Sequence, residues 1–106
     1  MKKIYIFAPD KQEVIETLVD AASQHGAGII GNYSHCYFLT KGTGNWKSLD
    51  GAHPTIGHVG EYSHVPEVKI EMVCPDENVV SVVRAIRNVH PYEEPEIDVI
   101  SLDPDK

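Results

Sequence analysis

The densest group of chemically capable side chains lies between two prolines, in residues 90–96. A histidine beside carboxylates suits a divalent metal, and a carboxylate can also tune a histidine for acid–base chemistry. The alternative is a rigid turn in which Tyr92 is packed while Glu93 and Glu94 are solvated. The two prolines fix the backbone in either case. We favour the turn, because a metal site needs more converging ligands than this segment supplies.

A second group follows a glycine-rich stretch and places His35 and Cys36 side by side. Imidazole and thiol together suggest a metal site or a nucleophile with its base. Adjacent residues of a strand point to opposite faces, so we do not expect these two side chains to share a site. The glycines are expected to form a tight turn, and Cys36 to be a small buried hydrophobe.

A third group occupies residues 41–67, which show no sustained hydrophobic period and are therefore predicted to form a long loop, at most with a short hairpin inside. Gly42 and Gly44 could wrap a phosphate, but the diagnostic version of such a loop opens a helix, and no helical pattern follows. An exposed loop that carries Trp46 and several histidines suits an oligomer seam or a small-ligand lid. These histidines are His53, His58 and His64.

Apolar patterns predict the elements that must position these groups. Runs rich in β-formers predict four strands, at residues 4–7, 35–40, 68–74 and 97–102, the first of them buried on both faces. Helical spacing predicts one helix capped by Asp10 and ended at Gly26, and another capped by Asp76 and ended by Pro91.

The order strand, helix, strand, loop, strand, helix, strand predicts an α+β fold. Two βαβ halves most economically interleave into a ferredoxin-like split βαβ sandwich, an antiparallel four-stranded sheet with both helices on one face. The whole chain, 1–106, is expected to be a single domain. The other face of the sheet is too apolar for water alone, and we expect an oligomer to cover it. The residues that make it so are Tyr5, Phe7, Tyr37, Ile100 and Leu102.

Composition excludes several classes of function. The 106 residues are 42% hydrophobic and carry a net charge of −7, which is typical of a packed globular domain and unsuited to nucleic acid. No run is long and apolar enough for a signal peptide or a bilayer span, so no membrane role is expected. The two cysteines lack CxxC spacing, and reduced thiols in a cytoplasmic protein are the default.

The same residues also carry a family resemblance, because their motifs follow one another in a fixed order over about residues 3–102. The chain resembles the PII-like (CutA-like) insert domain of the YqfO-type Nif-three-like family. The motifs are Gly26-Ala27-Gly28, Ile30 to Cys36, Gly42-Thr43-Gly44, Gly51-Ala52, Pro54, Ile56-Gly57, Val59-Gly60-Glu61, Val68, Ile70-Glu71 and His90 to Pro95.

This resemblance implies a fold related to the PII signal proteins and CutA, which assemble as trimers. Full-length members surround the insert with two halves that hold a dinuclear metal site, and no residues remain here to supply it. The hydrolase-like name of that family is therefore not expected to transfer. His53 replaces a common asparagine and adds a ligand that the insert does not normally have.

Our leading hypothesis is a non-enzymatic small-ligand-binding or regulatory module, a homotrimer with clefts between subunits, where PII-like trimers place small ligands. A separate partner protein is also compatible with this hypothesis. The candidate ligand-binding residues are Asn32, Tyr33, His35, Gly42, Gly44, Trp46, His90, Tyr92, Glu93 and Glu94.

Two alternatives stay open. The first is a divalent metal binder with CutA-like behaviour, and a divalent metal is the only cofactor to which the sequence points. Its candidate ligands are His35, His53, His58, His90 and Glu93, with His64 and Glu94 as further donors. The second is an enzyme that uses His90 and Glu93 for acid–base chemistry, although the sequence shows no nucleophile and no cofactor-binding motif beside them.

Overall fold

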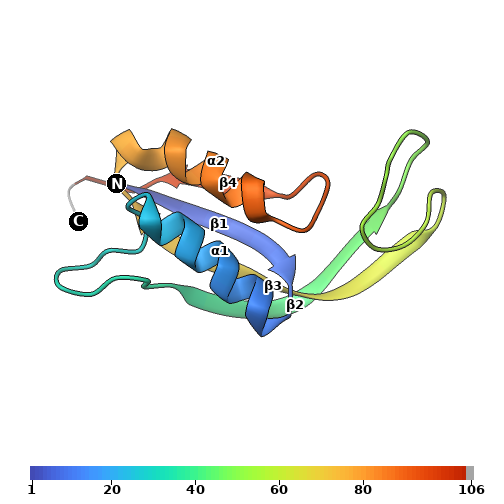
Figure 1. Cartoon of the computed structure of the whole chain (residues 1–106), viewed down its shortest axis with the longest axis horizontal. Helices are drawn as coiled ribbons and strands as arrows, with labels where there is room; N and C mark the ends of the chain where they lie inside the picture. The colour runs from blue at the N-terminus through green and yellow to red at the C-terminus, as the bar shows by residue number, and fades with distance from the viewer. Residues whose placement is uncertain (105–106) are drawn as a thin grey trace.

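The computed structural model describes residues 1–104 of the chain, which form a four-stranded antiparallel sheet with two helices on one of its faces (Figure 1). The strand order across the sheet is β2-β3-β1-β4. This arrangement is the predicted βαββαβ fold. The elements are β1 (Lys2–Pro9), α1 (Gln12–Gln24), β2 (Phe38–Lys47), β3 (Tyr62–Cys74), the 3-10 turn Asp76–Asn78, α2 (Val79–Val89) and β4 (Ile97–Ser101).

The core lies between the helices and the two central strands. Every second residue of β1 and of the second half of β3 is buried there, which is the pattern of strands with one covered face. The expectation that the first strand is buried on both faces is wrong, because Tyr5 and Phe7 on its other face are only half-buried. The strand residues of the core are Ile4, Ile6, Ala8, Val68, Ile70, Met72 and Cys74, and the helices add Ile15, Leu18, Val19, Ala22, Val82 and Ile86.

The helix ends agree with the predicted stops but not with the predicted caps. α1 ends just before Gly26, whose φ of 105° suits glycine, and α2 ends at Val89, before the proline. Neither predicted aspartate caps its helix: the N-cap of α1 is Lys11, without a side-chain hydrogen bond. Asp76 instead begins the 3-10 turn and pairs with the N-terminal amine of Met1 at 2.8 Å.

The predicted long loop 41–67 is shorter in the structure, because residues 41–47 and 62–67 belong to the two paired strands of a β-hairpin. β2 and β3 pair continuously from Phe38 with Glu71 to Lys47 with Tyr62, and only residues 48–61 remain as the connecting loop. β2 was expected at 35–40 but begins at Phe38 and runs on to Lys47. Most residues of β2 are exposed, whichever face of the sheet they are on. The sequence of this strand therefore lacks the alternation of apolar and polar residues by which a half-buried strand is predicted.

The two ends of the described chain lie together, opposite the tip of this hairpin (Figure 1). Lys2 pairs with Ser101 in the β1–β4 ladder, and its Nζ donates to Ser101 Oγ at 2.7 Å. The backbone N–H of Leu102 also donates to the carbonyl of Met1 at 3.2 Å. The start of β1 and the end of β4 are thus adjacent in the structure.

None of the helices within residues 1–104 has the length and apolar character needed to cross a membrane.

Candidate functional site

A groove of about 640 Å³ opens between the far end of the hairpin and the turn that follows α2. Its walls come from β2, the loop 48–61 and residues 92–96, with contributions from β1 and β3. The lining residues are Phe7, Thr43, Gly44, Asn45, Trp46, Lys47, Ser48, Leu49, Ala52, Pro54, Thr55, Ile56, Glu67, Tyr92, Glu93, Glu94 and Glu96. A volume of this size is typical of small-molecule sites.

Two hydrogen bonds hold the hairpin loop to the turn and so close one side of the groove. The backbone N–H of His53 donates to Glu93 Oε1 at 3.0 Å, and Thr55 Oγ1 donates to the carbonyl of Pro91 at 2.7 Å. These bonds link segments about 40 residues apart in the chain. The groove therefore depends on tertiary contacts between its two walls.

Tyr92 and Trp46 form the aromatic part of the groove. Their rings meet edge to face, with centroids 5.6 Å apart and an interplanar angle of 61°. The hydroxyl of Tyr92 donates to Glu67 Oε2 at 2.7 Å. Burial, followed by this hydrogen bond to a carboxylate, raises the pKa of Tyr92 above its usual value, so the phenol stays protonated.

Gly44 makes room for this arrangement. A Cβ at position 44 would overlap the carboxylate of Glu67, a residue of the neighbouring strand β3 whose register partner is Gly42. Gly42, two residues earlier in β2, has open space where its Cβ would be. A side chain at position 44 would thus displace the Glu67 carboxylate from its place beside the Tyr92 hydroxyl, whereas one at position 42 would meet no neighbouring atom.

His90 lies behind the groove and is nearly fully buried, at 9% exposure. Its Nε2–H donates to the carbonyl of Phe7 at 2.8 Å, and its Nδ1 accepts the backbone N–H of Tyr92 at 3.0 Å. Burial lowers the pKa of His90, which keeps the ring neutral. Because both ring nitrogens are occupied, His90 supports the turn and offers no lone pair to a metal or a substrate proton. This geometry matches the rigid-turn interpretation of residues 90–96.

Carboxylates surround the open part of the groove. Glu93, Glu94 and Glu96 are exposed, and Glu67 is half-buried beneath them. Glu96 shares a hydrogen bond with Asp98, and this contact, more than burial, raises the pKa of Glu96. The groove thus has a carboxylate-rich rim, because Asp98 adds a further acidic side chain beside Glu96.

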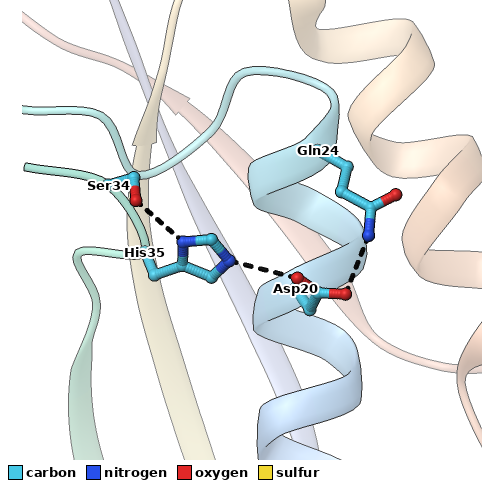
Figure 2. Close-up of polar contacts among 4 residues, drawn as sticks. All are labelled: Asp20, Gln24, Ser34 and His35. Carbon is cyan, nitrogen blue, oxygen red and sulfur yellow. Dashed lines mark hydrogen bonds and ion pairs between the residues drawn. The ribbon is translucent and has the colours of Figure 1, made fainter.

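The other predicted ligand-binding residues lie at the opposite end of the molecule. There His35 bridges the loop and α1: its Nε2 is 3.1 Å from Asp20 Oδ1, and its Nδ1 is 2.9 Å from Ser34 Oγ (Figure 2). Gln24 donates to the other oxygen of Asp20 at 2.8 Å. These groups are exposed to solvent, and their contacts fasten the loop to the helix.

The predicted set is therefore divided. Gly44, Trp46, Tyr92, Glu93 and Glu94 line the groove, whereas the remaining candidates do not. Those outside its lining are Asn32, Tyr33 and His35 at the other end, Gly42 in β2, and the buried His90. Cys36, predicted to be buried, is half-buried, and its Sγ lies 3.9 Å from the carbonyl oxygen of Ser34.

The candidate metal ligands do not converge within one chain. Across residues 1–104, no group of three or more His, Cys, Asp or Glu side chains is close enough to hold a metal ion. His53 reaches Glu93 through its backbone N–H, and His64 Nδ1 lies 2.6 Å from Asn45 Oδ1. His58 belongs to the loop 48–61. One chain thus contains no assembled metal centre among the described residues.

The candidate residues chosen from the sequence include only five of the seventeen residues that line the groove. Phe7 and Glu67 reach it through the pairing of β1 with β3, which places their strands beside the turn. Thr55 reaches it because the loop folds back onto Pro91. The available signal was Trp46, because a tryptophan in a glycine-rich stretch with no hydrophobic period is expected to pack against another part of the protein, and in the structure it is half-buried.

Comparisons with known proteins agree on one family of relatives. No family model matches the chain. Curated proteins named GTP cyclohydrolase 1 type 2 homolog are similar to it: the one from Bacillus subtilis (strain 168) is 42% identical over 97% of this chain. The one from Mycobacterium tuberculosis (strain ATCC 25618 / H37Rv) is 41% identical over 98%. The chain spans 27% of the length of each of these relatives.

Solved structures extend the comparison to the fold. A Bacillus cereus protein related to NIF3 matches 96% of this chain and 25% of its own, with a TM-score of 0.80 and 38% identity. The periplasmic divalent cation tolerance protein CutA from Archaeoglobus fulgidus has a TM-score of 0.68 at 17% identity, over 97% of this chain and 85% of its own. The PII-like protein CutA from Nostoc sp. PCC 7120 gives 0.67 at 22% identity, over 99% and 84%. The chain is thus homologous to a segment of the NIF3-related GTP cyclohydrolase 1 type 2 homologs, and its fold is the CutA-like, PII-like fold.

Proposed function

We propose that this protein is a non-enzymatic, PII-like binding or regulatory module that takes a small ligand in the groove between the hairpin loop and the turn 90–96. The observation that carries the proposal is the aromatic and carboxylate-lined groove, whose two walls are fastened by the His53–Glu93 and Thr55–Pro91 hydrogen bonds. Such preformed concave sites with a few placed polar groups are the usual form of a ligand pocket.

The proposal includes a homo-oligomer, with a trimer favoured, acting in the cytoplasm. The family resemblance to PII and CutA supports a trimer. Exposed apolar side chains on and beside the edge strand β2 support an interface there: Phe38 is 68% exposed and Tyr33 is 75% exposed. Two free cysteines within residues 1–104 suit a reducing compartment.

NMR chemical-shift mapping tests the ligand proposal. The ¹⁵N-labelled protein is mixed with pools of anionic, cationic and neutral small molecules, and shifts are expected at the groove, including Trp46, Glu67 and Tyr92. The Gly44→Ala variant displaces the carboxylate of Glu67 and should weaken any such binding, while Gly42→Ala, in open space on the same strand, should not. If no pool shifts the groove signals, the proposal is wrong.

A further inference from the structure

Negative side chains outnumber positive ones among the residues that line the groove. Four of them are glutamates and one is a lysine. The lysine is not directed at a carboxylate, since Lys47 Nζ lies over the ring of Tyr62, 5.4 Å from its centroid. The glutamates are Glu67, Glu93, Glu94 and Glu96.

No protein cation neutralises these glutamates within residues 1–104. The ion pairs of that region are Met1 with Asp76, Lys3 with Glu71, His35 with Asp20 and Lys41 with Asp10. Glu67 accepts a hydrogen bond from the Tyr92 hydroxyl and Glu93 accepts one from the backbone N–H of His53, and neither of these donors is a cation. Like charges around one cavity repel one another, and a bound cation would relieve that repulsion.

The aromatic residues of the same groove favour a cation as well. Trp46 and Tyr92 line the cavity and meet edge to face, and Phe7 adds a third ring to the lining. The face of an aromatic ring is negative and attracts ammonium groups within about 6 Å. Carboxylates and ring faces together recognise an organic ammonium group, and both disfavour phosphate or carboxylate ligands.

The size of the groove and the spacing of its carboxylates favour an organic cation over a metal ion as the ligand. The described residues hold no cluster of three metal-ligating side chains, so the carboxylates are too dispersed to coordinate one ion. A cavity of about 640 Å³ with apolar walls formed by Leu49, Pro54 and Ile56 suits a molecule with several charges joined by methylene groups.

We propose that the groove binds an aliphatic polyamine, with its ammonium groups at the carboxylates and its methylene chain against the aromatic and aliphatic walls. This inference rests on the proposed function, because it names the ligand class of the same groove. Polyamine binding should weaken as ionic strength rises, since salt screens the charges of exposed carboxylates.

The test uses spermidine as the probe and the intact protein. Trp46 is the single tryptophan of the chain, so its fluorescence reports on the groove directly, and calorimetry gives the stoichiometry. Spermidine is expected to bind one site per chain, whereas triethylene glycol, a neutral chain of similar length, should not bind. Mg²⁺ should not displace spermidine at equal concentration.

A matched pair of variants locates the site. The double variant Glu94→Gln/Glu96→Gln should bind spermidine about tenfold more weakly, as the loss of two exposed charge pairs predicts. Glu13→Gln/Glu16→Gln removes the same charge from the exposed face of α1 and should bind as the parent does. Circular dichroism and thermal melting establish that both variants are folded.

The outcomes separate the two proposals. If spermidine fails to bind, or if both double variants weaken it equally, the polyamine inference is wrong. If, at the same time, other small molecules shift the groove signals in the NMR experiment, the proposed binding function stands with a different ligand class. If nothing shifts them, both proposals fall.

Discussion

The ring of His90 joins three parts of the molecule. It stands at the end of α2, donates to the backbone of β1 at Phe7, and accepts the N–H of Tyr92 in the turn. A buried donor or acceptor that loses its partner costs free energy, and here one side chain satisfies one of each. The position of Tyr92 in the groove therefore depends on a residue that does not line it.

The variant His90→Leu should lower the free energy of unfolding by about 2–4 kcal/mol. Leucine fills a similar volume but leaves the Phe7 carbonyl and the Tyr92 N–H without partners. Urea unfolding at pH 7.5 measures the change. The matched control is His58→Leu, in the exposed loop, which should stay within about 0.5 kcal/mol of the parent. Equal losses in the two variants would contradict this role of His90.

Protonation of His90 should make the protein less stable in mild acid. Burial holds the pKa of His90 below its ordinary value of 6.5 in the folded state. As pH falls below 6.5, the unfolded chain binds a proton that the folded chain does not, so stability decreases until the folded pKa is passed. The difference in unfolding free energy between the parent and His90→Leu should therefore shrink from pH 7.5 to 5.5. A constant difference would show that His90 does not contribute to the pH dependence.

Gly28 is a second residue with a large expected effect. Its φ is 74°, and a Cβ there would approach the backbone carbonyl of Cys36 to 2.9 Å and Met72 Cε to 2.6 Å. Gly28→Ala should thus lower the free energy of unfolding by about 3 kcal/mol, through backbone strain and overlap combined. Gly31→Ala, with a φ of 57° and open space, should cost only about 1 kcal/mol. Thermal or urea unfolding of the two variants compares them, and similar losses would contradict the steric argument.

At the scale of elements, the sequence was informative wherever burial is one-sided. β1 and the second half of β3 alternate because one face meets the core, and the helices repeat at 3.6 residues for the same reason. The arm of the hairpin has no such constraint: β2 is exposed on most of its length, and its strand character depends on pairing with β3. Its position in the sheet could not be read from local residue types.

The same contrast applies to the groove. Trp46, Tyr92 and Glu93 were found because their types and neighbours suggested binding. Thr55 and Glu67 were missed because their place depends on the register of the hairpin and on the folding of the loop over Pro91. Register is set by many pairings at once, and no local motif encodes it.

The loop 48–61 should open more often when its two hydrogen bonds to residues 91 and 93 are removed or weakened. The double variant Thr55→Val/Glu93→Gln removes the hydroxyl donor to Pro91 and weakens the acceptor for His53 N–H. Hydrogen exchange should accelerate about tenfold in residues 48–61, while the central strands keep their protection, because local opening leaves the core intact. Thr40→Val, an exposed change in β2, is the control and should leave loop exchange unchanged. Unaltered exchange in the double variant would mean that other contacts hold the loop.

At the scale of the whole molecule, many large apolar side chains outside the core are exposed to solvent. The described chain measures 45 Å along its longest axis but only about half that across, because the hairpin extends beyond the helices. Tyr33, Phe38 and Tyr62 are each more than two-thirds exposed. A lone domain seldom leaves aromatic residues so open, which is why assembly belongs to the proposed function.

Light scattering on the purified protein should give the mass of a trimer, with or without added zinc. Burial of the exposed aromatic residues supplies the driving force, and no described metal cluster is needed for it. Phe38→Glu should shift the mass toward the monomer, whereas Val80→Glu, equally exposed on α2, should not. A monomer in the parent protein, or a trimer that forms only with zinc, would contradict the proposal.

The adjacency of Lys2 and Ser101 has a consequence for how such a domain can be shared among proteins. A polypeptide that enters at β1 and leaves at β4 travels almost no net distance, so a host protein can accept the whole unit by splitting one of its surface turns. The relatives, of which this chain spans 27%, are long enough to be such hosts. In that arrangement the groove would lie at the end of the domain farthest from the host, where it would remain open to solvent.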